Sequence, residues 1–270
     1  MIFPKRIILR RAFFVIQILL LLPIVWFMYH VFLPRNFTSK TAEVLPLKLS
    51  SGAFETLYYA AEHPRGILIV ATGDGGWSDQ WEEPVALHAA AAGFAVGGWD
   101  CRKFANTRSF DQPKLVAAFN AAVAAVRIRA GLPADCPVWF SGWSTGAEWS
   151  LAAAACPARE KHLVGILAAS PGERSRYGIS GNDLLGLPVV GPGSYALADL
   201  APALRGVRIV QFAGELDVLD DTEWLKSLDA ATPHKLVLLP GASHDMDGAG
   251  PRFIAEFDMA IQWMLDLRGL

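Results

Sequence analysis

The stretch VWFSGWSTGAEWSLAAAA, from Val138 to Ala155, contains the pattern Gly142-Trp143-Ser144-Thr145-Gly146. In a G-x-S-x-G pattern, small residues on both sides of a serine allow a strand to turn sharply into a helix and leave the hydroxyl exposed. The pattern alone is weak evidence, because it occurs by chance in about one chain in ten of this length. The alternative is an ordinary turn serine, so the rest of the chain decides whether Ser144 is a nucleophile.

Apolar runs with strand character alternate with helical patterns over most of the chain. Runs such as GILIVAT and VRIVQFAG lack polar alternation, which is typical of strands buried on both faces. Two initial strands followed by this alternation predict an α/β fold, with a mostly parallel sheet of about eight strands and helices on both faces. The predicted strands are residues 44–49, 56–60, 66–71, 94–99, 138–141, 163–168, 207–212 and 235–239; the predicted helices are 80–92, 113–130, 145–155, 222–228 and 252–267.

One segment, residues 173–204, interrupts the alternation. Its sequence, ERSRYGISGNDLLGLPVVGPGSYALADLAPAL, is rich in glycine and proline and has no long amphipathic period. Irregular stretches of this length inside a domain are more often functional than accidental. We therefore expect a lid or substrate-binding cap here.

The N-terminus carries a long apolar segment, residues 12–33, preceded by Lys5, Arg6, Arg10 and Arg11. As a helix it would measure about 33 Å, which is enough to cross the roughly 30 Å hydrocarbon core of a bilayer. The positive charges before it predict a cytoplasmic N-terminus and an extracytoplasmic domain. The alternative is a cleaved signal peptide, although no A-x-A-like site closes the segment. The predicted organisation is a basic N-terminus (1–11), a transmembrane anchor (12–33), a linker (34–43) and one domain (44–270).

Charge and cysteine content exclude some classes of partner. The net charge is −2, and no basic stripe lies outside the N-terminal cluster, so we expect no nucleic-acid partner. The three cysteines fit no zinc-binding spacing, and neither a metal nor an organic cofactor is implied. Cys136 and Cys156 would lie at the same edge of the sheet, so they form either a disulfide or two buried thiols.

Four chain segments with catalytic character follow predicted strands. They are the GDGGW segment (Gly73–Trp77), Ser144, Asp217 and His244. The carboxyl ends of parallel strands share one edge, where ligands bind. The order serine, acid, histidine is that of α/β-hydrolase triads, in which the histidine activates the serine and the carboxylate orients the histidine.

The remaining site residues support that triad or bind substrate. Asp220 and Asp221 are alternatives to Asp217 as the acid. Backbone N–H groups that hold an oxyanion would come from Gly75, Gly76 and Thr145. Candidate substrate-binding residues are Asp74, Trp77, Arg102, Trp143 and Arg174, and Asp74 is expected mainly to shape its loop. Arginine suits phosphate groups, whereas acidic side chains in the same region, Glu148 among them, suit a cationic group.

The segments ILIVATGDGGWSDQ, GFAVGGWDCRKF, GWSTGAE and LPGASHDMDG resemble the VirJ/AcvB family of bacterial virulence-associated proteins, from about Gly66 to Leu267. The resemblance implies a periplasmic α/β-hydrolase-like domain associated with type IV secretion. In AcvB-type members it also implies hydrolysis of aminoacylated phosphatidylglycerol, chiefly the lysyl form. By position, Ser144 would be the nucleophile, with Asp217 and His244 as partners. Trp143 and Thr145 replace an expected tyrosine and a bulkier apolar residue, and Ser243-His244-Asp245 replaces an expected double histidine.

Together these features predict a serine hydrolase anchored in the bacterial inner membrane, with its catalytic domain in the periplasm. The resemblance implies a membrane phospholipid, an aminoacyl-phosphatidylglycerol, as the substrate. Two alternatives are a non-catalytic envelope protein that docks on secretion-system proteins, and a general periplasmic esterase or thioesterase.

Overall fold

The computed structural model describes residues 21–26, 28, 37–50, 52–106 and 110–266. Contacts divide the chain into two units, Met1–Pro34 and Arg35–Leu270. In the first unit, residues 21–26 and 28 are helical, and the remainder of the predicted 12–33 anchor lies outside the described residues, as does the basic segment 1–11. No helix in the described part of the chain has the length and apolarity needed to cross a bilayer.

The second unit is built on an eight-stranded sheet with the order β1-β2-β4-β3-β5-β6-β9-β10. The β1–β2 and β2–β4 pairs are antiparallel and the other pairs are parallel. All eight strands were predicted from the sequence. Their bounds are β1 (Glu43–Leu49), β2 (Gly52–Tyr59), β3 (Ile67–Ala71), β4 (Ala95–Trp99), β5 (Val138–Trp143), β6 (Leu163–Ala169), β9 (Arg208–Gly214) and β10 (His234–Leu239).

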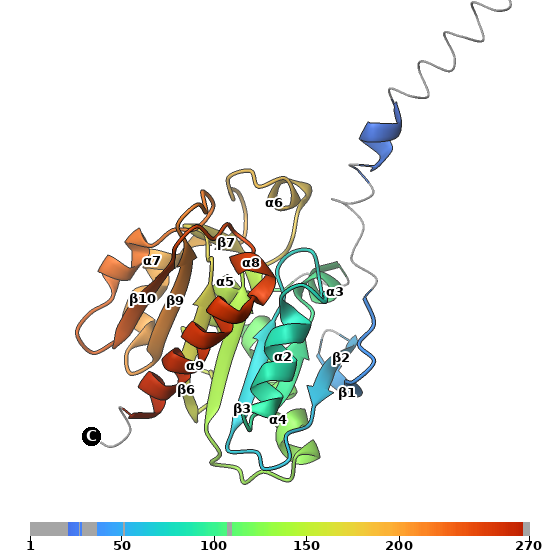
Figure 1. The fold of residues 1–270 in the computed structure, drawn as a ribbon, viewed down its shortest axis with the longest axis vertical. Coiled ribbons are helices and arrows are strands. Elements are labelled where there is room, and N and C mark those ends of the chain that lie inside the picture. Colours follow the sequence, from blue (N-terminus) through green and yellow to red (C-terminus); the bar gives the residue numbers. More distant parts are fainter. Residues whose placement is uncertain (1–20, 27, 29–36, 51, 107–109, 267–270) are drawn as a thin grey trace, which may run out of the picture. The chain divides into compact units, whose positions relative to one another are not determined.

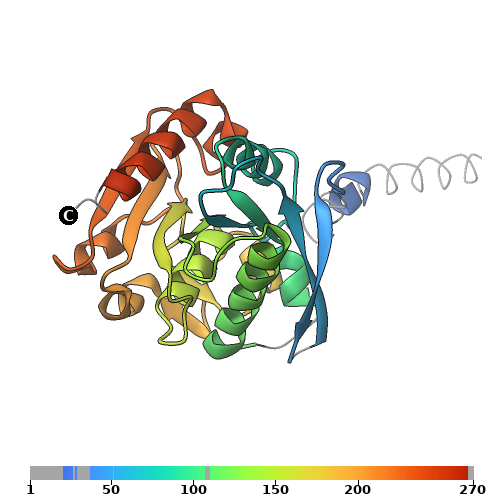
Figure 2. The ribbon, with the colours of Figure 1, turned by 90° about the horizontal axis from the view of Figure 1, so that it is seen from below.

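Helices cover both faces of the sheet. Figure 2 shows α2 (Glu82–Ala91) and α9 (Pro251–Asp266) on one side and α4 (Gln112–Arg129) on the other. Two apolar cores lie between these layers, one on each face. The central strands separate the cores, and all five residues of β3 are buried. This two-sided burial is the reason that their sequences are apolar without alternation.

Local signals explain where the long helices begin. Asp111 precedes α4 and accepts a hydrogen bond from the Lys114 backbone N–H at 3.0 Å, while Pro113 occupies the first turn. An aspartate cap and an early proline are both favoured there, because the first N–H groups of a helix lack partners. Helix α5 (Thr145–Ala154) follows β5 directly.

Four details differ from the sequence prediction. The predicted helix 222–228 is a 3₁₀ helix, η2 (Glu223–Ser227), and two short helices, α3 (Cys101–Asn106) and α8 (Met246–Ala249), were not predicted. The 173–204 segment contains short regular elements where an irregular stretch was expected. They are β7 (Arg174–Arg176), α6 (Gly181–Leu184), β8 (Ser194–Ala196), α7 (Leu197–Leu200) and η1 (Ala201–Leu204), with β7 and β8 paired antiparallel. Elements of three to five residues are too short to show a sequence period.

All three cysteines, Cys101, Cys136 and Cys156, are buried and free. Of the two possibilities for Cys136 and Cys156, the structure therefore has the buried thiols. Residues 37–42, in the predicted linker, contact the domain: Phe37 and Ala42 pack against the core that contains α2 and α9. Ser39 Oγ donates a hydrogen bond to Glu83 Oε1 at 2.7 Å.

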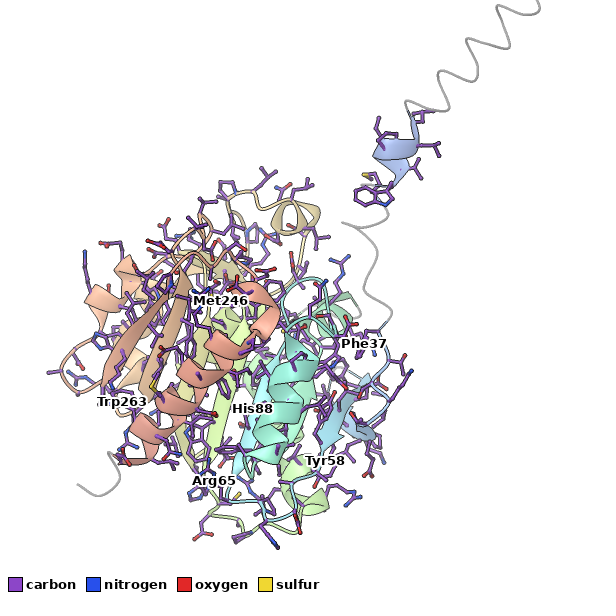
Figure 3. All side chains as sticks on the ribbon, in the orientation of Figure 1. Phe37, Tyr58, Arg65, His88, Met246 and Trp263 are labelled. Atoms are coloured by element: carbon purple, nitrogen blue, oxygen red, sulfur yellow. The ribbon has the colours of Figure 1, made fainter. Side chains whose placement is uncertain are left out.

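Loops that follow the parallel strands gather at one edge of the domain, where Figure 1 places β7, α6 and α8 (Met246–Ala249). In Figure 3, Met246, two residues after His244, lies at this edge, and Arg65, which precedes β3, lies at the opposite one. The sheet thus brings the segments after β3, β5, β9 and β10 together.

Candidate active site

Ser144 occupies a strained turn between β5 and α5. Its φ of 53° and ψ of −122° lie in a region that residues other than glycine rarely adopt. Its N–H donates to the Ala169 carbonyl of β6 at 2.8 Å, and its carbonyl accepts from the N–H groups of Ala147 and Glu148. Strain of this kind persists only where the surroundings impose it, and it is concentrated at functional sites.

The two glycines of the pattern make this turn possible. A Cβ at Gly142 would lie 2.3 Å from the backbone of Gly146, and a Cβ at Gly146 would lie 2.3 Å from the Ala71 carbonyl oxygen. Both contacts are far inside van der Waals distance and both involve backbone. The helix can therefore approach β3 and β5 this closely only without side chains at these positions.

We expect Gly146→Ala to lower the free energy of unfolding by an amount near the upper end of the roughly 1–3 kcal/mol typical of overpacking. The added methyl group meets the Ala71 carbonyl, so α5 must move away from β3. Chemical denaturation would measure the loss. Gly131→Ala is the control, because a Cβ there meets no atom within 4 Å and only its positive φ of 65° opposes the change. Equal losses in both variants would contradict the close-approach argument.

Asp217 follows β9 and binds His244. Asp217 Oδ2 accepts hydrogen bonds from His244 Nδ1 at 2.8 Å and from Ser170 Oγ at 2.7 Å, and Oδ1 accepts from the Leu219 N–H at 2.8 Å. Burial by itself would raise the pKa of this carboxyl, but the hydrogen bonds from His244, Ser170 and Leu219 outweigh burial and lower it to about 2. Asp217 is therefore ionised at neutral pH.

His244 is held by contacts on two sides. Burial lowers the pKa of His244, but the hydrogen bond that His244 donates to Asp217 and the charges of Asp217, Asp74 and Glu148 outweigh burial, so the pKa is raised above 6.5. On the other side, the His244 carbonyl accepts a hydrogen bond from Trp143 Nε1 at 2.6 Å. In the tautomer that donates Nδ1–H to the carboxylate, Nε2 is left as a base.

This geometry predicts the pH dependence of any reaction that uses His244 as a base. The base must be neutral, and the raised pKa means that more alkaline pH is needed to deprotonate it. We expect kcat/KM to rise with pH through a midpoint above 6.5 and then to reach a plateau. A pH series with a substrate that does not titrate in this range measures the midpoint. A midpoint below 6.5 would show that the carboxylates do not act on His244 as described.

Ser144 and His244 line the same cavity, which has a volume of about 360 Å³. Asp74, Thr145 and Glu148 line it from the domain core, and residues of the 173–204 segment, Arg174 among them, close it from outside. The volume is within the range of small-molecule sites. Among the described residues no hydrogen bond joins Ser144 to His244, and such catalytic contacts are often loose until substrate binds. In the same part of the chain, no cluster of His, Cys, Asp and Glu is arranged to hold a metal ion.

The candidate oxyanion donors differ in availability. Thr145 is the first residue of α5, and the first N–H groups of a helix have no partner within it. The Gly76 N–H instead donates to the Gly73 carbonyl at 3.3 Å, so this turn engages one of the two predicted glycines. Gly75 remains the candidate donor from that loop.

Three of the predicted substrate-binding residues are placed elsewhere. Trp77 is 2% exposed, stacks on Tyr59 and donates Nε1–H to Glu83, so it is a core residue. Arg102 is also buried, next to Gly76, and does not line the cavity. Trp143 positions the His244 backbone, as described above. The structure does not bring Trp77 and Arg102 to the cavity wall, because position after a strand does not determine whether a side chain turns inward.

Buried carboxylates fix the loop after β3. Asp100 accepts hydrogen bonds from the N–H groups of Trp77 at 3.3 Å and Lys103 at 2.8 Å, and burial raises the pKa of Asp100. Glu82 accepts hydrogen bonds from the Gly73 N–H at 3.4 Å and from Ser78 Oγ at 2.5 Å. The loop that carries Asp74 and Gly75 is thus held at both ends before substrate arrives.

Two further residues belong to the site: sequence reasoning assigned Ser170 no role, and it placed Glu148 only among the acidic side chains that suit a cationic group. Ser170 follows β6 at the same edge and donates to Asp217, so its position after a strand was an available signal. Glu148 lies one turn after Ser144, is 8% exposed, and accepts a hydrogen bond from the Gly172 N–H at 3.0 Å. Burial raises the pKa of Glu148 to about 7 against the hydrogen bonds from Ser175 and Gly172. With Asp74, it makes the inner cavity acidic.

Solved structures share this architecture. An α/β hydrolase, GrgF from Penicillium sp. sh18, aligns with a TM-score of 0.64 and 15% identity over 83% of this chain and 97% of its own. A putative dienelactone hydrolase from Klebsiella pneumoniae aligns with a TM-score of 0.62 and 14% identity over 83% and 98%. An α-β serine hydrolase homologue from Coxiella burnetii aligns with a TM-score of 0.58 and 16% identity over 84% and 99%. No family model and no curated protein matches the sequence. The strand order and these structural likenesses show that the chain has the α/β-hydrolase fold.

Proposed function

We propose that this protein is a serine hydrolase that cleaves carboxylic esters. The observation that carries the proposal is the shared cavity wall: Ser144, on a strained turn, and His244, bonded to Asp217, both line it. A serine hydroxyl needs a base to become nucleophilic, and the base needs a group that fixes its tautomer. These three side chains supply those roles in one place.

In the proposed reaction, Ser144 Oγ attacks the ester carbonyl and His244 Nε2 takes the hydroxyl proton. The N–H groups of Thr145 and Gly75 hold the oxyanion. Collapse of the tetrahedral intermediate breaks the bond to the alcohol, which leaves with the proton from His244. Water, deprotonated by the same histidine, then attacks the acyl-serine and releases the acid.

For the substrate we propose an ester whose acyl group carries a cationic amine, an aminoacyl-phosphatidylglycerol of the cell envelope. Asp74 and Glu148 support a cationic acyl group, because both line the cavity that holds Ser144 and because a cation beside Glu148, whose pKa burial raises to about 7, favours its ionised form. The resemblance to the VirJ/AcvB family supports the same substrate. If residues 12–33 anchor the chain in the inner membrane, the tether concentrates the enzyme at this lipid.

A fluorophosphonate probe tests the serine hydrolase proposal directly. The full chain is incubated with the probe and digested, and the modified peptide is identified by mass spectrometry. We expect the adduct on Ser144, with Ser150 and Ser170 as internal controls that stay unmodified. A folded protein that forms no adduct would support the alternative of a non-catalytic docking protein.

Glu148→Gln tests the aminoacyl specificity. We expect kcat/KM for a lysyl ester to fall about tenfold or more, because a contact to a charged group is lost. For the lysyl ester that is acetylated on both its α-amine and its ε-amine, so that the acyl group is neutral, the change should be much smaller. Glu62→Gln, whose side chain is 91% exposed, is the control. Equal losses on both esters would mean that Glu148 only supports the structure, and they would remove this argument for a cationic substrate.

A further inference from the structure

The mouth of the cavity carries an unusual concentration of exposed apolar side chains. Residues 37–266 expose twelve large hydrophobic side chains, and six of these lie in two short loops. The first loop, residues 185–190, follows α6, and the second, residues 216–219, contains Asp217. We call these two loops the apolar lip. The exposed side chains are Leu185, Leu187, Val190, Leu216, Val218 and Leu219, of which Val218 is 92% exposed.

The two loops of the apolar lip adjoin each other and the cavity. A Cβ at Gly186 would lie 3.8 Å from Leu219 Cδ2. Leu187, Val218 and Leu219 also line the cavity that contains Ser144. Contiguous exposed apolar patches mark interaction sites more often than scattered ones do. Any molecule bound on the apolar lip is therefore next to the proposed nucleophile.

The backbone polar groups of the apolar lip form hydrogen bonds with the domain. The carbonyls of Val189 and Val190 accept hydrogen bonds from Arg174 and Arg176 of β7. In the second loop, the Leu216 N–H donates to the Ala242 carbonyl at 2.9 Å and the Leu219 N–H donates to Asp217 Oδ1 at 2.8 Å. These hydrogen bonds fix the backbone of the apolar lip to the domain, while its aliphatic side chains face solvent.

The chemistry of the apolar lip favours lipid over protein as its occupant. The sequence has no charged residue between Asp183 and Asp199, and the exposed side chains of the lip are all aliphatic. Protein interfaces are usually anchored by tyrosine, tryptophan and arginine, which the exposed lip lacks. Aliphatic side chains instead gain from insertion about 5–10 Å into the headgroup and acyl boundary of a bilayer.

Chain length is consistent with the same occupant. The predicted anchor ends at residue 33, and Phe37 already packs against the domain, with Ser39 bonded to Glu83. The four Cα-to-Cα steps from residue 33 to 37 reach at most about 14 Å. If residues 12–33 are anchored in a bilayer, a connection this short leaves the domain able to contact the lipid surface.

We propose that the apolar lip docks on a lipid bilayer and receives the acyl chains of a lipid ester whose carbonyl enters the cavity. The lipid nature of the substrate rests on the proposed function, whereas the docking itself does not require catalysis. The apolar lip supplies the apolar contacts to the lipid. The inner cavity, with Asp74 and Glu148, supplies the polar contacts.

Site-directed fluorescence tests the docking in the full Ser144→Ala chain. An NBD label is placed on Val190→Cys or Leu216→Cys, one from each loop of the lip, and on Ile128→Cys of α4 as the control. These side chains are 62%, 64% and 81% exposed, and the three native cysteines are buried, so labelling is selective. The proteins are mixed with phosphatidylcholine–phosphatidylglycerol vesicles that contain or lack nitroxide-bearing lipid. We expect several-fold stronger nitroxide quenching at positions 190 and 216 than at position 128.

Equal quenching at the three positions, or no quenching at the lip, overturns the proposal. Emission at the lip that changes on adding protein but not lipid assigns the surface to a protein partner and also overturns it. In the active chain, Val190→Ser with Leu216→Ser should lower hydrolysis of an ester in vesicles several-fold and leave a water-soluble short-chain ester unchanged, while Ile128→Ser affects neither. If no ester is cleaved and Ser144 forms no adduct, the proposed function fails, but quenching still decides the docking.

Discussion

Ser144→Ala is expected to reduce ester hydrolysis by on the order of 10⁴-fold or more, because the acyl-enzyme cannot form without the hydroxyl. His244 and the oxyanion donors would remain, but the substrate bond would have to be broken by direct attack of water. Release of the carboxylic acid product, followed under saturating substrate, measures the loss. The substitution leaves the φ of 53° and the backbone hydrogen bonds of the turn unchanged, so thermal unfolding should be close to that of the wild type.

Ser243→Ala is the matched control for Ser144→Ala. Ser243 is exposed, directly precedes His244 and donates a hydrogen bond to Asp245 at 2.9 Å. Its loss should leave hydrolysis within a few-fold of wild type. If Ser144→Ala keeps wild-type activity, Ser144 is not the nucleophile and the cavity performs different chemistry.

The order and type of the main elements could be predicted because burial leaves a direct trace in the sequence. Strands such as β3 and β6 lie between two apolar cores, so every residue in them is apolar. The short elements between β6 and β9 left no such trace. They contact the domain through individual bonds, such as Trp149 Nε1 to the Arg176 carbonyl at 2.9 Å, that no local pattern reveals.

The sequence predicts which site residues follow strand ends, but it does not predict which way their side chains point. Ser144 and His244 line one cavity, and Asp217 binds His244, because parallel strands place their carboxyl ends at one edge. Trp77 and Arg102 follow strands as well, yet their side chains turn into the domain. Glu82 and Asp100, which fix the loop after β3, belong to a helix and to a strand end whose approach to that loop depends on tertiary packing.

The fold also explains why Asp217, and neither of the two nearby aspartates, binds His244. The Asp217 N–H donates to the Gly214 carbonyl in a tight turn at the end of β9, and the carboxylate accepts hydrogen bonds from four donors: His244, Ser170 and the N–H groups of Leu219 and Asp220. Asp220 accepts from Gln211 instead. Burial, together with the charge of Asp217, raises the pKa of Asp220 to about 7, so it is a poor permanent counter-charge for an imidazolium.

Asp217→Asn is expected to lower kcat by about 10⁴-fold, because an amide stabilises the wrong histidine tautomer and no longer balances the imidazolium charge. The remaining activity should also respond differently to pH. The hydrogen bond and the charge of Asp217 are the main contributions that raise the pKa of His244, so their removal leaves burial to lower that pKa. The midpoint of the pH profile should therefore shift toward acid.

Asp220→Asn is the control for Asp217→Asn, since it replaces a neighbouring, partly buried carboxylate that Gln211 binds. We expect it to keep most of the activity. Asp220→Asn also removes a negative charge next to Asp217, so the Asp217 carboxylate should remain ionised. Loss of activity in Asp220→Asn with retention in Asp217→Asn would make Asp220 the catalytic acid, and the His244–Asp217 hydrogen bond would then be structural. Asp217→Asn and Asp220→Asn each replace a carboxylate by an amide, three residues apart. Comparing their activities therefore separates the loss of His244 orientation from the loss of a negative charge in this loop.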